Sequence, residues 1–353
     1  MSALAAAVQL GHEQVSFHQE PDADYTAIVA IHSSVLGPAV GGTRLLSYPS
    51  LDDALLDALR LSRGMTYKNA AAGLPLGGAK AVILGDSRRP DRERLFRAHG
   101  RNVERFGGRF ITAEDVGTSA EDVAIIGRET RHVRGFGGLG SPSPWTARGV
   151  CRAIQAAAHE RWGSDSLAGR TVALQGCGQV GARLAGLLAA AGARLLVSDT
   201  EPRLVEAVVR ELDATVVESA AIYDARADVF APCALGAVLD DRTIPRLRVE
   251  IVAGAANNQL LDDRHGRLLE ERGILYAPDF IANAGGVISS AAGLLGWQHA
   301  RVVEHIDGIY DTILAVFERA RRDRVPASEA ADRLAEARLE ACRGALTASR
   351  PPY

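Results

Sequence analysis

The sequence predicts an α/β protein of two domains, and three observations carry this prediction. The chain has 353 residues, more than the ~100–200 residues of one typical domain. Apolar, β-branched runs alternate with amphipathic helical segments, a pattern typical of parallel sheets covered by helices. A cluster of Gly, Pro and Ser at residues 135–144 interrupts this pattern and is the best candidate for an interdomain linker or hinge.

The composition is that of an ordinary soluble globular protein and argues against several function classes. Hydrophobic residues make up 47% of the chain and charged residues 24%. A net charge of −3 provides no basic footprint for nucleic acid or for an anionic membrane. No apolar run reaches the ~18 residues of a membrane span. We therefore expect small-molecule partners, with no nucleic acid and no membrane.

The cysteines give a second compositional prediction. Cys151, Cys177, Cys233 and Cys342 are widely separated, and none forms a C-x-x-C pair. This spacing disfavours both a zinc site and a disulfide scaffold. We expect no metal site, and a reducing cytoplasm as the location of the protein.

Residues 1–138 are expected to form the first domain, in which strands alternate with helices. The expected strands lie at residues 25–33, 80–86 and 109–117, and the expected helices begin at Leu51 and Arg92. β-Branched residues favour the first strand. Ser50 is expected to cap the first helix, with Asp52 and Asp53 near the positive end of the helix dipole.

Residues 139–298 are expected to form the second domain, built of successive strand and helix units. A helix is expected at 145–162, followed by units that start near residues 170, 193, 228, 251 and 274. This alternation predicts a parallel sheet with helices on both faces. Residues 299–353 show no strand signal and read as helices broken at Pro326, which we expect to pack back on the first domain and the cleft.

The segment GCGQVG at residues 176–181 has the spacing of a dinucleotide-binding turn. It follows the apolar strand TVALQ, opens a helix, and precedes a second strand that ends at Asp199. Gly176, Gly178 and Gly181 permit a tight turn and close approach of a pyrophosphate to the helix N-terminus. The acidic residue can bond a ribose hydroxyl and repel a 2′-phosphate, which favours NAD over NADP. A glycine-rich structural turn is the alternative.

Lys68, Lys80 and Asp115 are the candidate catalytic residues of the first domain. The residues between the two lysines are mostly small or apolar. One ammonium can bind a substrate carboxylate, while the other, in an apolar pocket beside that charge, would have a lowered pKa and act as a general base. A nearby aspartate can shuttle a proton, so the set suits oxidation of an α-amino acid. The alternative is lysines at solvated helix and strand ends, with an aspartate that caps a turn.

Six segments read, in chain order, GPAVGGTR, DALRLSRGMTYKNAAAGLPLGGAK, AEDVGTS, FAPCALG, VAGAANNQL and ILYAPDFIANAGGVI. Together they resemble the leucine/valine/phenylalanine branch of the amino-acid dehydrogenase superfamily that includes glutamate dehydrogenase. The resemblance extends from about Gly11 to Ala341. It implies a substrate-binding and catalytic first domain, a Rossmann-type second domain that binds NAD, and a cleft that closes between them. It also implies a homo-oligomer that deaminates an apolar L-amino acid.

The resemblance implies roles for individual residues. Lys80 and Asp115 correspond to the catalytic lysine and aspartate, and Lys68 to the lysine that binds the substrate carboxylate. The other residues expected to contact the substrate are Gly41, Val40, Met65, Ala113, Asn283, Val287 and Ser290. The residues expected to contact NAD are Gly176, Gly178, Gln179, Val180, Gly181, Asp199, Thr146, Ala234 and Asn257.

The implied side-chain pocket is apolar apart from Ser290 and has no basic residue to pair with a second carboxylate. Glutamate is therefore disfavoured as a substrate. Leucine, valine and isoleucine are favoured, and phenylalanine or another aromatic amino acid is the alternative. Ala79, Trp145 and Ser290 depart from the family's wording and leave the preferred side chain open, and Ala79 would be strained if its position had a positive φ. A non-catalytic NAD-binding protein is the alternative from another class.

Overall fold

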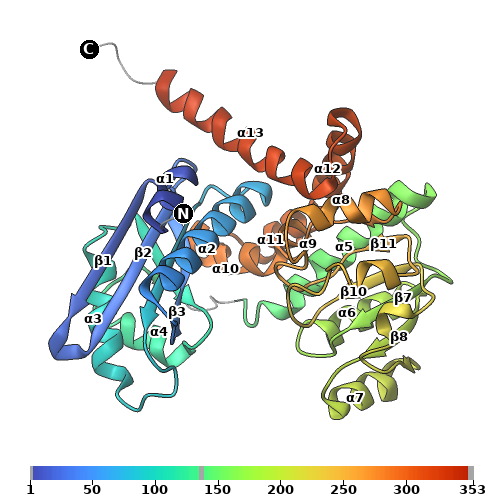
Figure 1. Cartoon of the computed structure of the whole chain (residues 1–353), viewed down its shortest axis with the longest axis horizontal. Coiled ribbons are helices and arrows are strands. Elements are labelled where there is room, and N and C mark those ends of the chain that lie inside the picture. The colour runs from blue at the N-terminus through green and yellow to red at the C-terminus, as the bar shows by residue number, and fades with distance from the viewer. Residues whose placement is uncertain (1–2, 135–138, 349–353) are drawn as a thin grey trace. The chain divides into compact units, whose positions relative to one another are not determined.

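The computed structural model describes residues 3–134 and 139–348, and the chain divides into two compact units (Figure 1). The first unit comprises Met1–Gly137 together with Ala335–Tyr353, and the second comprises Gly138–Leu334. The first four residues of the expected linker, 135–138, lie outside the described residues. Each unit contains a six-stranded sheet with helices, which confirms the predicted α/β fold class.

The first unit is built on a mixed sheet with the strand order β1-β2-β4-β3-β5-β6. Its strands are β1 (Gln14–Glu20), β2 (Tyr25–Ser33), β3 (Ala39–Leu46), β4 (Gly77–Leu84), β5 (Phe110–Glu114) and β6 (Val133–Arg134). Its helices are α1 (Ala3–Gln9), α2 (Leu51–Ala71), α3 (Arg92–Glu104) and α4 (Ala120–Ile126), with a short 3₁₀ turn η1 (Pro21–Ala23). All the strands and helices expected in this part of the chain are present.

The sequence pattern predicts neither β1 nor β3, and the first sheet is not parallel throughout. β1 pairs with β2 and β2 pairs with β4 in antiparallel fashion, whereas β3 is parallel to β4 and β5. Only η1 and Asp24, at a φ of 47°, join β1 to β2, and so short a connection allows only antiparallel pairing. Gly41 and Gly42 lower the strand propensity of β3, which explains why the pattern misses it.

The two faces of the first sheet bury separate clusters. On β2, Ile28 and Ala30 pack with residues of α1 and α2, whereas Val29 and Ile31 pack with Phe106 and other side chains on the opposite face. α2 begins at the predicted cap, where Ser50 Oγ accepts a hydrogen bond from Asp53 N at 3.1 Å. This arrangement places α2 over β2 and β4.

The second unit is built on a parallel sheet with the strand order β12-β11-β10-β7-β8-β9. Its strands are β7 (Thr171–Gln175), β8 (Arg194–Ser198), β9 (Thr215–Val216), β10 (Val229–Pro232), β11 (Ile251–Val252) and β12 (Leu275–Tyr276). Its helices are α5 (Ser143–Trp162), α6 (Gly181–Ala190), α7 (Pro202–Leu212), α8 (Arg264–Glu271), α9 (Asp279–Ala282), α10 (Gly285–Leu295), α11 (His299–Asp307) and α12 (Ile309–Asp323), with 3₁₀ turns η2 (Ile222–Asp224) and η3 (Ile244–Arg246). Strand order reverses between β7 and β10, which is the doubly wound, Rossmann-type arrangement.

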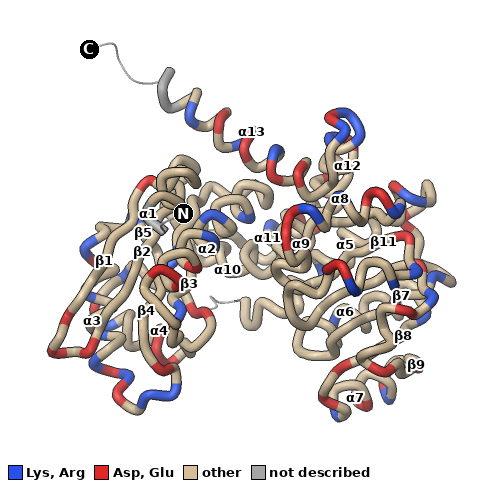
Figure 2. The backbone as a smooth tube through the Cα atoms, viewed as in Figure 1, with Lys and Arg blue, Asp and Glu red and all other residues tan. Residues whose placement is uncertain are grey.

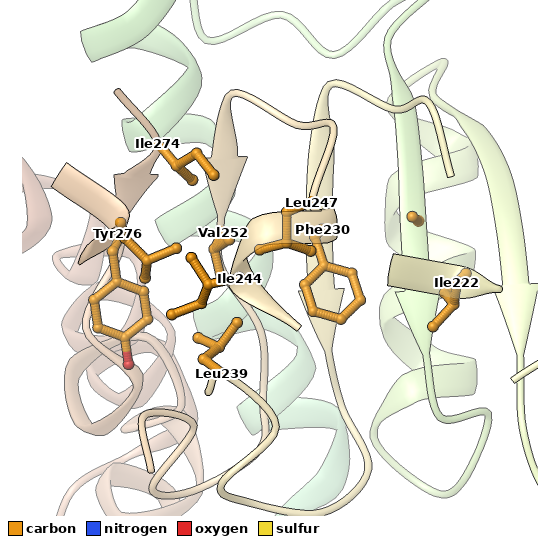
Figure 3. Close-up of a cluster of buried hydrophobic side chains, with 10 residues drawn as sticks. Ile222, Phe230, Leu239, Ile244, Leu247, Val252, Ile274 and Tyr276 are labelled. Atoms are coloured by element: carbon orange, nitrogen blue, oxygen red, sulfur yellow. The ribbon is translucent and has the colours of Figure 1, made fainter. Parts of the chain in front are cut away.

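Strand register builds the core of the second unit. Ala173, Phe230, Val252 and Tyr276 occupy one row across β7, β10, β11 and β12. All four belong to one buried apolar cluster, which Leu239, Ile244 and Leu247 cover (Figure 3). α5 and α6 pack on the sheet and on each other. The strands of a parallel sheet read as continuous apolar runs because both faces are buried.

The C-terminal helices differ in part from the prediction. A helical segment broken at Pro326 is present, since α12 ends at Asp323 and α13 (Ala327–Ala348) follows. However, residues 299–334 belong to the second unit, because α12 packs along α5 and α11 packs on α5 and α10. Only the part of α13 from Ala335 onwards belongs to the first unit.

Charges of both signs are interspersed over the described residues. Figure 2 shows acidic and basic residues following one another along α13 and mixing around α3 and α4. Opposite charges neutralise each other locally in ion pairs such as Arg97–Glu129, at 2.6 Å, and Arg128–Glu93, at 2.8 Å. Within residues 3–134 and 139–348, no helix is both long enough and apolar enough to cross a bilayer.

We predict that Leu247→Ala lowers the free energy of unfolding by about 2–5 kcal/mol, because it opens a cavity in the cluster of Figure 3. The measurement is urea unfolding followed by circular dichroism. Leu261→Ala is the matched control, since Leu261 is 55% exposed and its truncation should change stability by less than about 0.5 kcal/mol. Equal losses in the two variants would contradict the cluster's role as the core.

Candidate active site

A buried ion pair joins Lys80 of β4 to Asp115, the residue that follows β5. Lys80 is only 6% exposed, and its Nζ lies 2.5 Å from Asp115 Oδ2. β3 stands between β4 and β5, so the pair spans β3. Lys80 shares its side of β4 with Val82, which packs against α2. The two candidate catalytic residues are therefore in contact, on the face of the sheet that α2 covers.

Two glycines provide the space for this arrangement. A Cβ on Gly42 of β3 would lie 2.7 Å from Asp115 Cβ, and a Cβ on Gly78 of β4 would lie 2.1 Å from Thr66 N. Gly42 thus leaves room for Asp115 above β3, and Gly78 lets α2 approach the backbone of β4. Any larger side chain at either position would force the backbone to move.

Arg44 of β3 is a second cation at the same carboxylate, and the sequence interpretation missed it. Arg44 Nε donates to Asp115 Oδ2 at 3.2 Å, and Arg44 Nη1 donates to Asp57 Oδ2 at 2.8 Å. Tyr48 Oη donates to the same oxygen of Asp57 at 2.5 Å. The signal was available in GGTR, since Arg44 lies two residues beyond Gly42 and therefore on the same side of the strand.

Burial lowers the pKa of Lys80, and the negative charge of Asp115 partly opposes this effect. Arg44 lowers the pKa of Lys80 further because it is a neighbouring positive charge. Burial alone would raise the pKa of Asp115, but the charges of Lys80 and Arg44 outweigh it and hold this pKa below its usual value. Arg44 is therefore one neighbouring cation that lowers the pKa of Lys80, and the effect of Lys68 on Lys80 stays a prediction from the sequence.

Lys68 lies in the last turn of α2, where its side chain is half-buried. The end of this helix is capped from α13: Arg338 Nη1 donates to the carbonyl oxygens of Ala70 and Ala71 at 2.7 and 2.5 Å. The last carbonyl groups of a helix have no partner within the helix, so an external donor stabilises them. Arg338 thereby holds the end of α2 that carries Lys68.

The other candidate pocket residues of the first unit are Gly41, Val40, Met65 and Ala113. Gly41 is buried and the other three are half-buried. Val40 pairs with Gly78 in the register of β3 and β4. Gly78 in turn lies against Thr66 of α2, the residue that follows Met65. Ala113 pairs with Gly42 in the register of β3 and β5. The register therefore sets these side chains beside the glycines that flank the ion pair.

Ala79 does not strain the backbone. It lies within β4 and is not among the described residues that have a positive φ. Its side chain is fully buried in an apolar cluster with Ile31 and Phe110. The steric constraint applies instead to Gly41, because a Cβ there would lie 1.7 Å from the carbonyl oxygen of Ala79. Alanine is accepted at position 79, and glycine is required at position 41.

In the second unit, the segment at residues 176–181 forms a tight turn at the carboxyl end of β7. Gly176 has a φ of +99°, and a Cβ on Gly181 would lie 1.9 Å from the Gly176 carbonyl oxygen. A Cβ on Gly178, in contrast, would meet no described atom within 4 Å beyond its immediate neighbours in the chain. Two glycines therefore serve packing, and Gly178 leaves an open approach to the start of α6. Gln179 is exposed there, and Val180 occupies the N-cap position without a side-chain hydrogen bond.

Asp199 and Ala234 lie against this turn. Asp199 Oδ2 accepts a hydrogen bond from Cys177 N at 2.7 Å, and Ala234 N lies 2.8 Å from the position of a Cβ on Gly176. Ala234 follows β10, so the three segments meet where the strand order reverses. Ligands of doubly wound sheets bind at this point, outside the carboxyl ends of the strands.

Asn283 has an unsatisfied acceptor. Its side chain is 5% exposed, and its Nδ2 donates to Asn257 Oδ1 at 2.8 Å and to Ala255 O at 3.0 Å. Its Oδ1 has no hydrogen-bond partner among the described residues. A buried polar atom without a partner is costly, so this oxygen suits a donor group of a bound ligand.

The start of α5 meets α10 at a pair of glycines. A Cβ on Gly285 would lie 2.0 Å from the carbonyl oxygen of Trp145, and one on Gly286 would lie 2.6 Å from Thr146 Oγ1. Ser290 Oγ donates to Gly286 O at 2.9 Å, which occupies the hydroxyl hydrogen within the helix. Val287 and Ser290 are both half-buried on α10.

The indole ring of Trp145 packs edge-on against His299, with ring centroids 5.2 Å apart. Its Nε1 donates to Leu139 O at 3.4 Å. These contacts give the bulky residue a place within the second unit that leaves the adjacent Thr146 hydroxyl next to Gly286. Across the described parts of the chain, no group of three His, Cys, Asp or Glu side chains is arranged to hold a metal ion.

Comparison with known proteins matches two family models to this chain. The model described as Glu/Leu/Phe/Val dehydrogenase, dimerisation domain, matches residues 12–132. The model described as Glutamate/Leucine/Phenylalanine/Valine dehydrogenase matches residues 197–343. Together the two matches cover most of the chain.

Similar individual proteins are amino-acid dehydrogenases. Leucine dehydrogenase of Thermoactinomyces intermedius is 52% identical over 336 residues, which is 94% of this chain and 92% of that protein. Phenylalanine dehydrogenase of Lysinibacillus sphaericus is 45% identical over 338 residues, 93% of this chain and 89% of that protein. The crystal structure of L-tryptophan dehydrogenase from Nostoc punctiforme aligns with a TM-score of 0.89 at 44% identity, covering 97% of this chain and 99% of that one.

We predict that Gly178→Ala and Gly181→Ala have different effects. Gly181→Ala should lower the free energy of unfolding by about 1–3 kcal/mol, because its Cβ would overlap a backbone oxygen. Gly178→Ala should leave stability within about 0.5 kcal/mol but weaken dinucleotide binding about tenfold, by about 1.4 kcal/mol. Denaturant unfolding and fluorescence titration with NADH measure the two quantities. Full NADH affinity in the Gly178→Ala variant would rule out this turn as the phosphate site.

Proposed function

Because the chain belongs to the Glu/Leu/Phe/Val dehydrogenase family, we propose that it catalyses the NAD-dependent, reversible oxidative deamination of an apolar L-amino acid. The reaction converts the amino acid, NAD⁺ and water to the 2-oxo acid, ammonium, NADH and a proton. Its relatives are amino-acid dehydrogenases, and so is this protein. NAD as the cofactor, and leucine, valine and isoleucine as the favoured substrates, are the finer parts of the proposal.

The buried pair of Lys80 and Asp115 carries the proposal. A lysine whose pKa is lowered by burial can be neutral at working pH and act as a general base. Its contact with an ionised aspartate at 2.5 Å supplies a second group that can accept and return a proton. A solvated lysine at a strand end would have neither property.

Each residue of the first unit takes a defined role in the proposed reaction. Lys68 binds the substrate carboxylate, and NAD⁺, when bound, accepts the hydride from the substrate Cα. Lys80 then removes a proton from a water molecule as its oxygen bonds to the iminium carbon. Asp115 receives this proton from Lys80 and delivers it to the amine nitrogen. Lys80, neutral again, removes the hydroxyl proton as the carbon–nitrogen bond breaks, which leaves the 2-oxo acid and releases ammonia.

The second unit fits a nicotinamide dinucleotide at the reversal of strand order. The open approach at Gly178 and the start of α6 suit a pyrophosphate. We assign Gly176, Gly178, Gln179, Val180, Gly181, Asp199, Thr146, Ala234 and Asn257 to cofactor binding. Asp199, beside the turn, favours NAD because its carboxylate would repel a 2′-phosphate. We accordingly assign substrate binding and catalysis to the first unit and cofactor binding to the second.

Apolar residues support an apolar substrate. Val40, Met65 and Ala113 of the first unit, and Val287 with Ser290 of the second, provide no cation for a second carboxylate. Gly41 and Asn283 complete the proposed substrate contacts. Phenylalanine or another aromatic amino acid is the second candidate, supported by the similar phenylalanine dehydrogenase. We further propose a cytoplasmic homo-oligomer, on the cysteine spacing and the family membership.

We predict that, in a panel of L-amino acids, kcat/KM is greatest for leucine, valine or isoleucine and is at least about 100-fold lower for glutamate, whose carboxylate would be left unpaired. Initial rates of NADH formation at 340 nm measure this, with NADP⁺ tested beside NAD⁺. The same enzyme preparation serves as its own control across the panel. Preference for glutamate would contradict the pocket assignment, and equal use of NADP⁺ would contradict the role of Asp199.

We predict that Lys80→Ala lowers kcat by about 10²–10⁴-fold, the usual contribution of a general base. Affinity for NADH should change less than about threefold, because Lys80 is not among the residues proposed to bind the cofactor. Steady-state rates and NADH titration of the same preparation separate the two effects. A variant with wild-type turnover would remove Lys80 from its proposed role and, with it, the proposed mechanism.

A further inference from the structure

Arg44 lies between two carboxylates, and neither it nor the outer carboxylate has a role in the proposed reaction steps. Its Nε lies 3.2 Å from Asp115 Oδ2 and its Nη1 lies 2.8 Å from Asp57 Oδ2. The side chain of Arg44 is 19% exposed and that of Asp57 is 27% exposed. Tyr48 Oη donates to Asp57 at 2.5 Å and fixes its orientation. The order of charges is therefore Lys80, Asp115, Arg44 and Asp57.

Lys80 and Arg44 contact the same oxygen of Asp115, at 2.5 and 3.2 Å. A guanidinium remains protonated at any working pH, whereas a buried lysine can lose its proton. When Lys80 becomes neutral, Arg44 still neutralises Asp115. The aspartate is therefore not left as an unpaired buried anion, which would otherwise be costly.

Arg44 itself is shared with Asp57. The carboxylate of Asp57, on α2, neutralises part of the positive charge that Arg44 presents to Lys80. Removing Arg44 takes a positive charge away from Lys80, whereas removing the charge of Asp57 leaves Arg44 more strongly positive. The two changes therefore act on Lys80 with opposite sign.

We propose that Arg44 and Asp57 are positioning residues that set, in opposite directions, the pH at which Lys80 becomes a general base. Arg44 favours the neutral lysine, and Asp57 favours the charged lysine. This inference rests on the proposed role of Lys80 as the base. Neither residue needs to touch the substrate, since Arg44 acts on Lys80 by its charge and Asp57 acts through Arg44.

The charged surroundings of Lys80 support this assignment. Burial is the largest cause of its lowered pKa, Asp115 opposes the lowering, Arg44 adds to it and Asp57 opposes it. The elements packed around β4 present further titratable groups: Glu114 next to Asp115 on β5, Lys68 on α2, Tyr48 at Asp57, and His32 on β2, which bonds to Thr66 at 2.9 Å. Arg44 forms an ion pair with Asp115 and a second one with Asp57, which connects both residues to the partner of Lys80.

A purely structural role makes a different prediction. Arg44 also ties β3 to α2 through Asp57, so its loss could simply loosen the helix. Loosening would reduce activity by a similar factor at every pH and in the same direction for both variants. A change in the charge felt by Lys80 would instead displace the acid limb of the pH profile, and in opposite directions for the two variants.

The test is the pH profile of kcat/KM for the best amino acid of the panel. The rate rises with pH as Lys80 loses its proton. Arg44→Gln raises the pKa of Lys80, so the limb moves to higher pH and kcat/KM on that limb falls about tenfold. Asp57→Asn lowers this pKa, so the limb moves to lower pH and kcat/KM there rises several-fold. The acid limb of the double variant lies between those of the two single variants. Ionisation of the substrate is common to all variants and cannot produce this separation.

Three controls isolate charge from structure. Arg92→Gln removes the same side chain from another ion pair of the first unit, Arg92–Asp122 at 2.6 Å, and should leave the limb in place. Tyr48→Phe removes a hydrogen bond without changing any charge and should also leave it in place. Arg44→Lys keeps the positive charge and should restore the wild-type limb even where kcat is lower.

The inference would be overturned if the acid limbs of the Arg44→Gln and Asp57→Asn variants moved in the same direction. It would also be overturned if kcat/KM fell by the same factor at every pH, and Arg44 would then have only a structural role. If Arg44→Gln does not fold, the shift of Asp57→Asn to lower pH and the retained limb of Arg44→Lys decide the matter. The proposed function fails separately, if Lys80→Ala retains turnover. An inactive Lys80→Ala variant with unmoved limbs in the Arg44 and Asp57 variants would refute this inference alone.

Discussion

The structure of the first unit depends on one constraint, the burial of an ammonium group on a central strand. Lys80 is 6% exposed, and an ammonium in such surroundings needs an anionic partner. The partner, Asp115, comes from two strands away, across β3. Position 42 of β3 must therefore carry no side chain, since a Cβ there would meet Asp115 Cβ at 2.7 Å. The buried charge of Lys80 thus explains why β3 has a glycine at position 42 and why the residue after β5 is an aspartate.

Sequence reasoning succeeded where the signal is local and failed where it depends on register. The turn at Gly176–Gly181 was predictable because strand, glycines and helix are contiguous, and Gly176 and Gly181 each have a steric reason. β3 was not predicted, because adjacent glycines weaken a local strand signal although they serve contacts with β4 and β5. Arg44 was missed for the same reason: its importance comes from Asp115 and Asp57, which are distant in sequence. Alternation along β3 would have found it once the strand was known.

Discrimination among substrates follows two physical rules of different strength. Exclusion of a second carboxylate is an electrostatic effect, because a buried anion without a cation is strongly disfavoured. A choice between leucine and phenylalanine depends on pocket volume, and differences of this kind amount to only about 1–3 kcal/mol. The similarity of this chain to both leucine and phenylalanine dehydrogenases, at 52% and 45% identity, agrees with a scaffold on which small changes in side-chain size alter specificity.

Burial alone does not prepare a lysine and an aspartate to work together. Burial lowers the pKa of Lys80, which favours the neutral base, but it also favours a protonated Asp115. A permanent cation resolves this conflict, because its charge opposes protonation of the lysine and stabilises ionisation of the aspartate at the same time. Arg44 has the required position, within 3.2 Å of the shared oxygen. Asp57, which is paired with Arg44, opposes this lowering of the pKa of Lys80.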